Sequence, residues 1–121
     1  MDKQRQLIYF RNYFWAFFNK QSEKVKEKID QVLYLISVAE KIPRKFFGKI
    51  KGYDGLFEIR IEYSGNIYRI FCCFDEGNIV VLFNGFQKKT QKTPKEQLDR
   101  AARIKDEYFE YKKKGKTKWK I

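Results

Sequence analysis

The side chains of this chain that could do chemistry are arginines, lysines and carboxylates, because its 121 residues include no histidine. The commonest general base and metal ligand among side chains is therefore absent. Arg60 lies beside Glu58 in LFEIRIEY (56–63), and Arg69 lies in IYRIFCCFD (67–75). A guanidinium held by a strand can bind two oxygens of a phosphate at once. These two arginines are the first candidates for a site that acts on a phosphate.

The segments that carry the two arginines predict neighbouring strands. In residues 56–63 apolar side chains alternate with charged ones, the pattern of a half-buried strand. Residues 64–66 (SGN) are typical of a tight hairpin turn. Arg60 falls on the face opposite the isoleucines beside it, and Arg69 shares a face with Phe71, so the arginines converge if these faces coincide. In the alternative, one or both pair with the neighbouring glutamates and serve structure alone.

A lysine-rich stretch, GFQKKTQKTPKE (85–96), follows an apolar segment (79–86) that predicts a central strand covered on both faces. Lys88 and Lys89 leave the end of this strand, where they can reach the same concavity as the arginines; a solvated loop is the alternative. A second basic group lies in FFGKIKGYDG (46–55), which its three glycines predict to be a loop. The candidate anion-binding lysines of the two stretches are Lys49, Lys51, Lys88 and Lys92.

The N-terminal part predicts one strand and helices that would cover the sheet. QLIYFR (6–11) is rich in strand formers, and the aromatic residues 12–20 start helical structure. Ser22 can cap the helix that follows. Its apolar residues recur with the spacing of one helix face, at Val25, Ile29, Val32, Leu33 and Ile36.

The C-terminal part predicts a helix that begins with TPKE. Thr93 would be its N-cap, Pro94 its first helical residue and Glu96 its third, which together form a capping box. The order of elements is then β-α-α-β-β-β-α. It predicts an α+β domain with a small antiparallel sheet, formed by a meander plus the N-terminal strand, packed by the N-terminal helices and the C-terminal helix. We expect one domain at 1–112 and a basic tail at 113–121.

The charge points to a polyanion or an acidic partner, since 27 Lys and Arg against 15 Asp and Glu give a net charge of +12. The adjacent Cys72 and Cys73 would point to opposite faces of a strand, so we expect buried, unpaired thiols and no metal site. With no signal-peptide core and no apolar run long enough to span a bilayer, the expected location is the cytoplasm.

Three stretches together resemble a known family. LFEIRI (56–61), YRIF (68–71) and IVVLFNGFQKKTQKTPKEQLDRA (79–101) are similar to the HigB-like branch of the RelE/ParE toxin superfamily, a branch that includes phage-derived proteins. The third stretch is the most specific of them. The resemblance implies the toxin of a type II toxin–antitoxin pair, with a small antiparallel sheet packed by helices.

Many members of that superfamily are mRNA endoribonucleases that cut the message on the ribosome and so inhibit translation. The resemblance therefore implies a metal-independent endoribonuclease without a cofactor, mRNA on the ribosome as substrate and a helix-turn-helix antitoxin as partner. The positions that match the family's basic cleft are Arg60, Arg69 and Lys89, with Lys88 beside them.

In such a cleft Arg69 would stabilise the charged phosphorane, and Arg60 would share that task. Lys89 could donate a proton if it is buried among cations, and Glu58 is a possible base. Lys49, Lys51, Lys88 and Lys92 would bind the RNA backbone. The chain departs from its relatives in carrying Glu58 where many have lysine and in lacking histidine.

Two alternatives stay open. A toxin directed at gyrase, or one otherwise without nuclease activity, would not need the arginines and Lys89 to converge. A basic adaptor that binds RNA or an acidic protein would depend on total charge and not on any single arginine.

Overall fold

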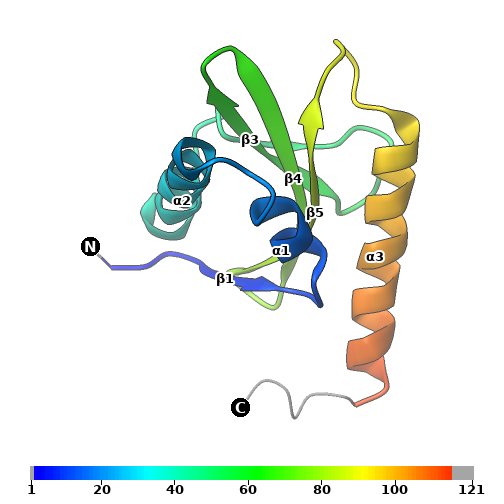
Figure 1. Cartoon of the computed structure of the whole chain (residues 1–121). Helices are drawn as coiled ribbons and strands as arrows, with labels where there is room; N and C mark the ends of the chain where they lie inside the picture. The colour runs from blue at the N-terminus through cyan, green and yellow to red at the C-terminus, as the bar shows by residue number, and fades with distance from the viewer. Residues whose placement is uncertain (1, 116–121) are drawn as a thin grey trace.

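The computed structural model describes residues 2–115, which form one five-stranded sheet and three helices (Figure 1). The strand order is β1-β5-β4-β3-β2, and every neighbouring pair is antiparallel except β1 and β5. The predicted α+β class is confirmed. The elements in chain order are β1 (Gln6–Tyr9), α1 (Tyr13–Phe18), α2 (Glu23–Val38), β2 (Phe47–Lys49), β3 (Phe57–Tyr63), β4 (Asn66–Asp75), β5 (Ile79–Lys88) and α3 (Lys95–Lys113).

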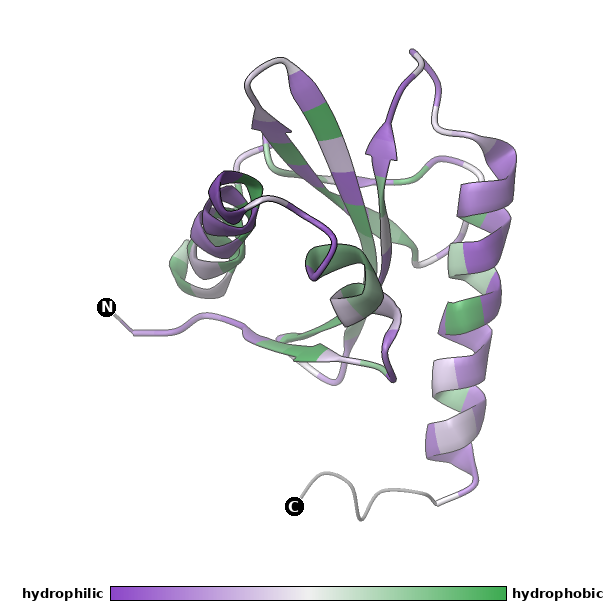
Figure 2. Cartoon of the chain, in the orientation of Figure 1, coloured by the Kyte–Doolittle hydropathy of each residue, from purple (hydrophilic) through white to green (hydrophobic). Residues whose placement is uncertain are grey.

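The helices cover the sheet from both sides. α1 and α2 pack on one face, over a core that includes Ile59, Ile70 and Val80. α3 packs on the other face, over a core that includes Phe71 and Val81. Figure 2 shows α3 as mostly hydrophilic, with its hydrophobic patches on the side toward the sheet. Because side chains alternate along a strand, each central strand contributes to both cores, as predicted for β5.

The turn between β3 and β4 sets the register of the site. Ser64 and Gly65 have φ of 51° and 82°, and Tyr63 pairs with Asn66 on either side of them. Positive φ at both central residues is the backbone of a type I′ turn, which joins antiparallel strands with the native twist. The turn therefore determines which residues of β3 and β4 lie opposite each other along the whole hairpin. Because side chains alternate between the two faces of a strand, it also determines which of them share a face.

Other sequence predictions are confirmed. Ser22 caps α2, because its hydroxyl accepts a hydrogen bond from the backbone N–H of Val25 at 3.3 Å. Cys72 and Cys73 are free and buried in the opposite cores. Burial raises the pKa of both thiols, that of Cys73 to about 12, so neither forms a thiolate readily.

The prediction of a loop over residues 46–55 is wrong in part, because this segment contains β2. Phe47 pairs with Ile59 and Lys49 with Phe57, which makes β2 the edge strand beside β3. A strand of three residues is too short to show an alternating pattern of apolar and polar side chains. The glycine at its centre is also more typical of a loop.

The capping box at Thr93 is also wrong. α3 begins at Lys95, and Pro94 occupies the N-cap position with an extended ψ of 136° and no side-chain cap. The first turn is held by other contacts: Lys95 Nζ donates to Asp99 Oδ2 at 2.8 Å, and the Tyr53 hydroxyl donates to Asp99 Oδ1 at 2.7 Å. At its other end α3 reaches Lys113, so the expected boundary after residue 112 falls inside it, and residues 116–121 of the expected tail lie outside the described residues.

A buried carboxylate fastens the end of α3 to the β4–β5 hairpin. Asp75 Oδ2 accepts hydrogen bonds from the Tyr108 hydroxyl at 2.6 Å and from Lys112 Nζ at 2.7 Å. Lys112 Nζ also bonds Glu76 Oε2 at 2.9 Å. Burial acts to raise the pKa of Asp75, but the hydrogen bonds from Lys112 and Tyr108 outweigh it and place the pKa below its ordinary value.

Replacing Asp75 by asparagine is expected to lower the free energy of unfolding at pH 7 by about 2 kcal/mol, since two hydrogen bonds to a charged group are lost. A lowered pKa in the folded state gives stability that is present above the ordinary pKa, near 3.9, and disappears as the pH falls through the folded pKa. Urea unfolding at pH 7, 4 and 2.5 should therefore show the difference between the proteins shrinking with acid. A difference that is constant over this range would contradict the assignment. The control is Glu110→Gln, which changes an exposed carboxylate on α3.

Candidate nucleic-acid interface

Arg60 and Arg69 lie directly opposite each other on β3 and β4, with their Cα atoms paired in the register. Both point to the side of the sheet that carries α3, since Ile59 and Ile61 belong to the core on the other side. The convergence predicted from the sequence is therefore present. Glu58 lies between the guanidinium groups: its Oε2 is 2.9 Å from Arg60 Nε and 3.5 Å from Arg69 Nε. The ion pair with a glutamate, which the alternative interpretation expects, is thus present together with the convergence of the arginines.

The three side chains differ in their access to solvent. Arg69 and Glu58 are 12% and 14% exposed, whereas Arg60 is 32% exposed. The Cα partners of Glu58 and Arg69 are Phe71 and Phe86, whose rings stack with centroids 5.7 Å apart. Burial lowers the pKa of the Arg69 guanidinium, an effect that Glu58 opposes and Arg60 reinforces. Among the described residues, Arg69 Nε has no hydrogen-bond partner.

Arg60 is held in place by the segment that leads into the edge strand β2. Its backbone N–H donates to the Phe46 carbonyl and its Nη1 to the Arg44 carbonyl, both at 2.8 Å. On the way the guanidinium passes over Gly48, where a methyl group would lie 2.7 Å from Arg60 Cζ. Neither role of these residues has a signature in the sequence. Both depend on which strand lies beside β3, whereas the sequence predicts a loop around Gly48.

Lys88 and Lys89 differ in placement. Lys88 is the last residue of β5, half-buried, and pairs with Ile67, two positions from Arg69 along β4. Since Arg69 pairs with Phe86, the side chain of Lys88 lies on the arginine side of the sheet. Lys89 follows the strand and is exposed, so the burial on which its role as proton donor depends is absent.

The other three predicted lysines are not brought to the arginines. Lys49 pairs with Phe57 and so lies on the face of α1 and α2. Lys49 and Lys51 line a separate hollow beside Tyr53. Lys92 is exposed between β5 and α3, where its carbonyl accepts a hydrogen bond from the Thr90 hydroxyl at 2.6 Å.

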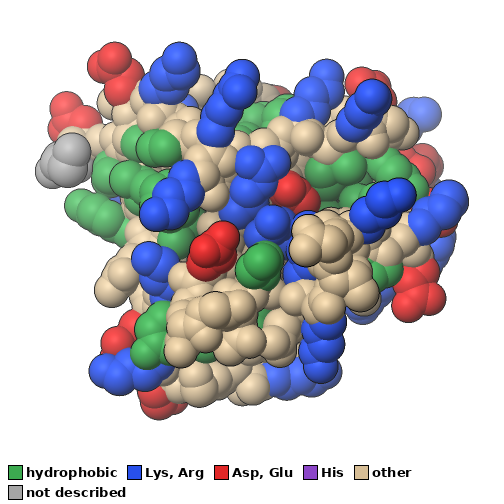
Figure 3. All heavy atoms as spheres, turned by 90° about the horizontal axis from the view of Figure 1, so that it is seen from above, with side chains coloured by type: hydrophobic (Ala, Val, Ile, Leu, Met, Phe, Trp, Pro, Cys, Tyr) green, Lys and Arg blue, Asp and Glu red, His purple; other side chains and the backbone are tan. Residues whose placement is uncertain are grey.

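Positive side chains spread over one end of the molecule. Figure 3 views the end at which Figure 1 places the β3–β4 hairpin and the segment after β5; Lys and Arg outnumber Asp and Glu on it. Such a surface attracts a polyanion through many phosphate contacts.

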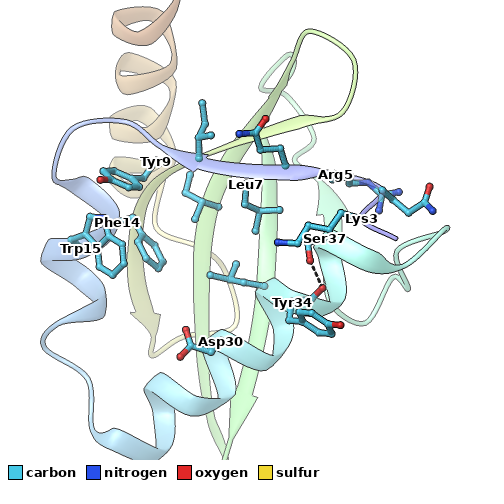
Figure 4. A pocket seen from close by; sticks show the side chains of 14 residues that line it. Lys3, Arg5, Leu7, Tyr9, Phe14, Trp15, Asp30, Tyr34 and Ser37 are labelled. Carbon is cyan, nitrogen blue, oxygen red and sulfur yellow. Dashed lines mark hydrogen bonds between the residues drawn. The ribbon is translucent and has the colours of Figure 1, made fainter. Parts of the chain in front are cut away.

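A larger hollow lies elsewhere, between β1, α1 and α2 (Figure 4). It has a volume of about 710 Å³ and a largely apolar lining that includes Tyr9, Trp15 and Tyr34. Two of its polar side chains are engaged: Arg5 Nη1 donates to the carbonyls of Ile36 and Ala39, and the Ser37 hydroxyl donates to the Tyr34 carbonyl, as the dashed line in Figure 4 marks. It lies at the sheet edge opposite β2 and does not adjoin the arginines.

Two further features of residues 2–115 bear on the site. None of their helices combines the length and the apolar character that crossing a bilayer requires. Nor do they gather three or more cysteine, aspartate or glutamate side chains where a metal ion could bind.

Comparison with protein families matches residues 16–106, a span that contains both arginines, Glu58 and Lys88, to the family described as phage derived protein Gp49-like (DUF891). The chain belongs to this family. The Gp49-like proteins are a RelE/HigB-like toxin family, related to the toxins of toxin–antitoxin pairs. No curated protein matches the chain. The α+β sheet described above is consistent with a RelE-like fold.

Replacing Gly48 by alanine tests the placement of Arg60. Gly48 has ordinary strand backbone, and the nearest atoms to the methyl group are those of the guanidinium, which must move away from Glu58 and the Arg44 carbonyl. We expect a loss of about 1 kcal/mol in the free energy of unfolding of the otherwise wild-type protein. In an Arg60→Ala background the same change should cost nothing or stabilise slightly. Equal effects in the two backgrounds, measured by urea unfolding as a double-mutant cycle, would show that the guanidinium does not lie over Gly48.

Proposed function

We propose that this Gp49-like protein is the toxin of a type II toxin–antitoxin pair and a HigB-like, ribosome-dependent mRNA endoribonuclease of the cytoplasm. The observation that carries the proposal is the pairing of Arg60 and Arg69 across β3 and β4. The pair lies near the turn of this hairpin, which is at the end of the molecule rich in Lys and Arg. Its family's relation to toxins supports the same conclusion. Its antitoxin would be a helix-turn-helix protein.

The proposed step needs no metal ion. The 2′-oxygen of a ribose bonds to the adjacent phosphorus, the bond from phosphorus to the 5′-oxygen breaks, and a cyclic phosphate and a free 5′-hydroxyl result. Arg69 and Arg60 would bind the equatorial oxygens of the phosphorane, where negative charge builds up. The proton of the 2′-hydroxyl passes to Glu58. The leaving 5′-oxygen takes a proton from Lys88, or from water held by Lys88 and Lys89.

Glu58 would have two successive roles in this scheme. In the free protein it offsets one of the two positive charges of the guanidinium groups, which both contact its Oε2 atom. A bound phosphate would compete for the same donors and leave the carboxylate free to accept the proton of the 2′-hydroxyl. In this scheme the carboxylate becomes available as the base only when a phosphate is present. The site has no histidine, so orientation of the mRNA by the ribosome would be important. Correct positioning of reacting groups can supply much of the reduction in the activation free energy.

Induction of the wild-type protein is expected to stop growth and to create new mRNA 5′ ends, and Arg69→Ala should lose both. Loss of one group that stabilises the transition state costs about 10²–10³-fold in rate. The matched control is Arg103→Ala, which removes the same charge from an exposed position on α3 and should stay toxic.

Each other outcome has a distinct meaning. Growth arrest without new mRNA ends would refute the nuclease and favour a toxin that acts on gyrase or another target. Full activity of Arg69→Ala would refute the role given to Arg69. Equal, partial losses in Arg69→Ala and Arg103→Ala would indicate an adaptor that depends on total charge.

A further inference from the structure

A small cationic hollow opens at the edge of β3, on the side of Arg60 away from Arg69. It has a volume of about 220 Å³. Three separate parts of the chain form it: α2, the segment before β2, and the β3–β4 hairpin. Its lining comprises Lys28, Lys45, Phe46, Arg60, Glu62, Tyr63, Ser64 and Gly65.

The hollow exists because β2 is short. β2 pairs with β3 only as far as Ile59, and the last backbone contact along that edge is the bond from the Arg60 N–H to the Phe46 carbonyl. From there to Tyr63 the edge of β3 has no strand beside it within the described residues. The open edge leaves room for a ligand directly next to the Arg60 guanidinium.

The charge of the hollow is not balanced internally. Lys28 and Lys45 face a single carboxylate, Glu62. The third cation, Arg60, is paired with Glu58 outside the hollow. Within residues 2–115 neither lysine forms an ion pair; Lys45 Nζ lies 5.7 Å from the centroid of the Phe46 ring. An excess of cations around a space of this size suits a phosphate group, and a large apolar ligand would not fit.

Tyr63 adds a surface on which a base can stack. Its side chain is among the few large apolar ones that are exposed, at 37%, and its ring pairs with no other ring of the described residues. Aromatic side chains beside a basic groove bind successive bases of single-stranded nucleic acids with little regard to sequence. The aromatic ring of Tyr63 therefore suits the base of a nucleotide, and the lysines of the hollow suit its phosphate.

We propose that this hollow is a second nucleotide subsite for single-stranded RNA. It binds the phosphate next to the one held at Arg69, with Lys28 and Lys45 as phosphate ligands and Tyr63 as the stacking platform. Arg60 belongs to both sites and so fixes the spacing of consecutive phosphates. The subsite rests on the proposed function and extends it, because it sets the path of the strand from the β3 edge across the arginine pair to Lys88.

The subsite is tested by the affinity of a labelled single-stranded RNA hexamer at several salt concentrations. The double variant Lys28→Ala/Lys45→Ala should bind at least 10-fold more weakly than wild type. The slope of log K against log salt should fall by about 0.7, since the two lysines hold one phosphate and each phosphate contact contributes about 0.7. The matched control Lys20→Ala/Lys41→Ala removes the same charge from exposed lysines outside the hollow and should lose less than 3-fold.

Substitution of Tyr63 tests whether a base stacks on its ring. Tyr63→Phe keeps the ring and should bind within 2-fold of wild type, whereas Tyr63→Ala should lose about 10-fold, the effect of one lost stacking contact. Thermal unfolding of each variant verifies that it is folded. Equal affinities of Tyr63→Phe and Tyr63→Ala would overturn the stacking role.

The result separates this inference from the proposed function. If wild type cleaves mRNA but Lys28→Ala/Lys45→Ala binds like its control, the subsite is wrong and the nuclease stands. If Lys28→Ala/Lys45→Ala loses RNA affinity but wild type makes no new mRNA ends, the nuclease is wrong and the subsite stands. If wild type does not bind the hexamer, or binds poly-glutamate equally well at the same lysines, the subsite is overturned.

Discussion

Everything proposed for this protein depends on the register of one hairpin. The two-residue turn at Ser64 and Gly65 pairs Tyr63 with Asn66, and the same register pairs Arg60 with Arg69. A slip of one residue would turn one arginine to the opposite face of the sheet, among the apolar side chains under α1 and α2. The turn therefore does more than connect two strands. It keeps two positive charges on one face, although like charges opposite each other are unfavourable in a sheet.

That electrostatic cost explains the surroundings of the arginines. Glu58 contacts both guanidinium groups, the Arg44 carbonyl accepts a hydrogen bond from Arg60, and Phe71 and Phe86 line the side of Arg69. A buried guanidinium without such partners would be costly. The same partners give the side chains a fixed starting geometry, and a fixed geometry is what a site that recognises phosphate needs. The stability of the sheet and the readiness of the site thus come from the same contacts.

The sequence was sufficient where local patterns decide the structure. Alternation along residues 57–63, the turn residues after them and the helical spacing from Val25 determine their own elements, and the face of each arginine follows from counting along a strand. It was insufficient where a distant segment decides. β2 and its contact with Arg60 depend on how the chain returns from α2, and the start of α3 depends on Tyr53, which lies some forty residues earlier. The hollow beside Arg60 has no local signature, because its lysines come from two segments that meet only in the folded protein.

The parallel pairing of β1 with β5 has a consequence for the order in which the protein can assemble. Gln6 pairs with Ile79, whereas the β3–β4 hairpin joins residues that are close in the chain. Contacts between near neighbours form early, and contacts across a long loop form late. At a synthesis rate of about 5–20 residues per second, the first strand waits roughly 4–15 seconds for its partner. During translation the arginine hairpin can therefore exist before either core is closed, and the N-terminal strand, made first, is among the last parts of the sheet to be placed.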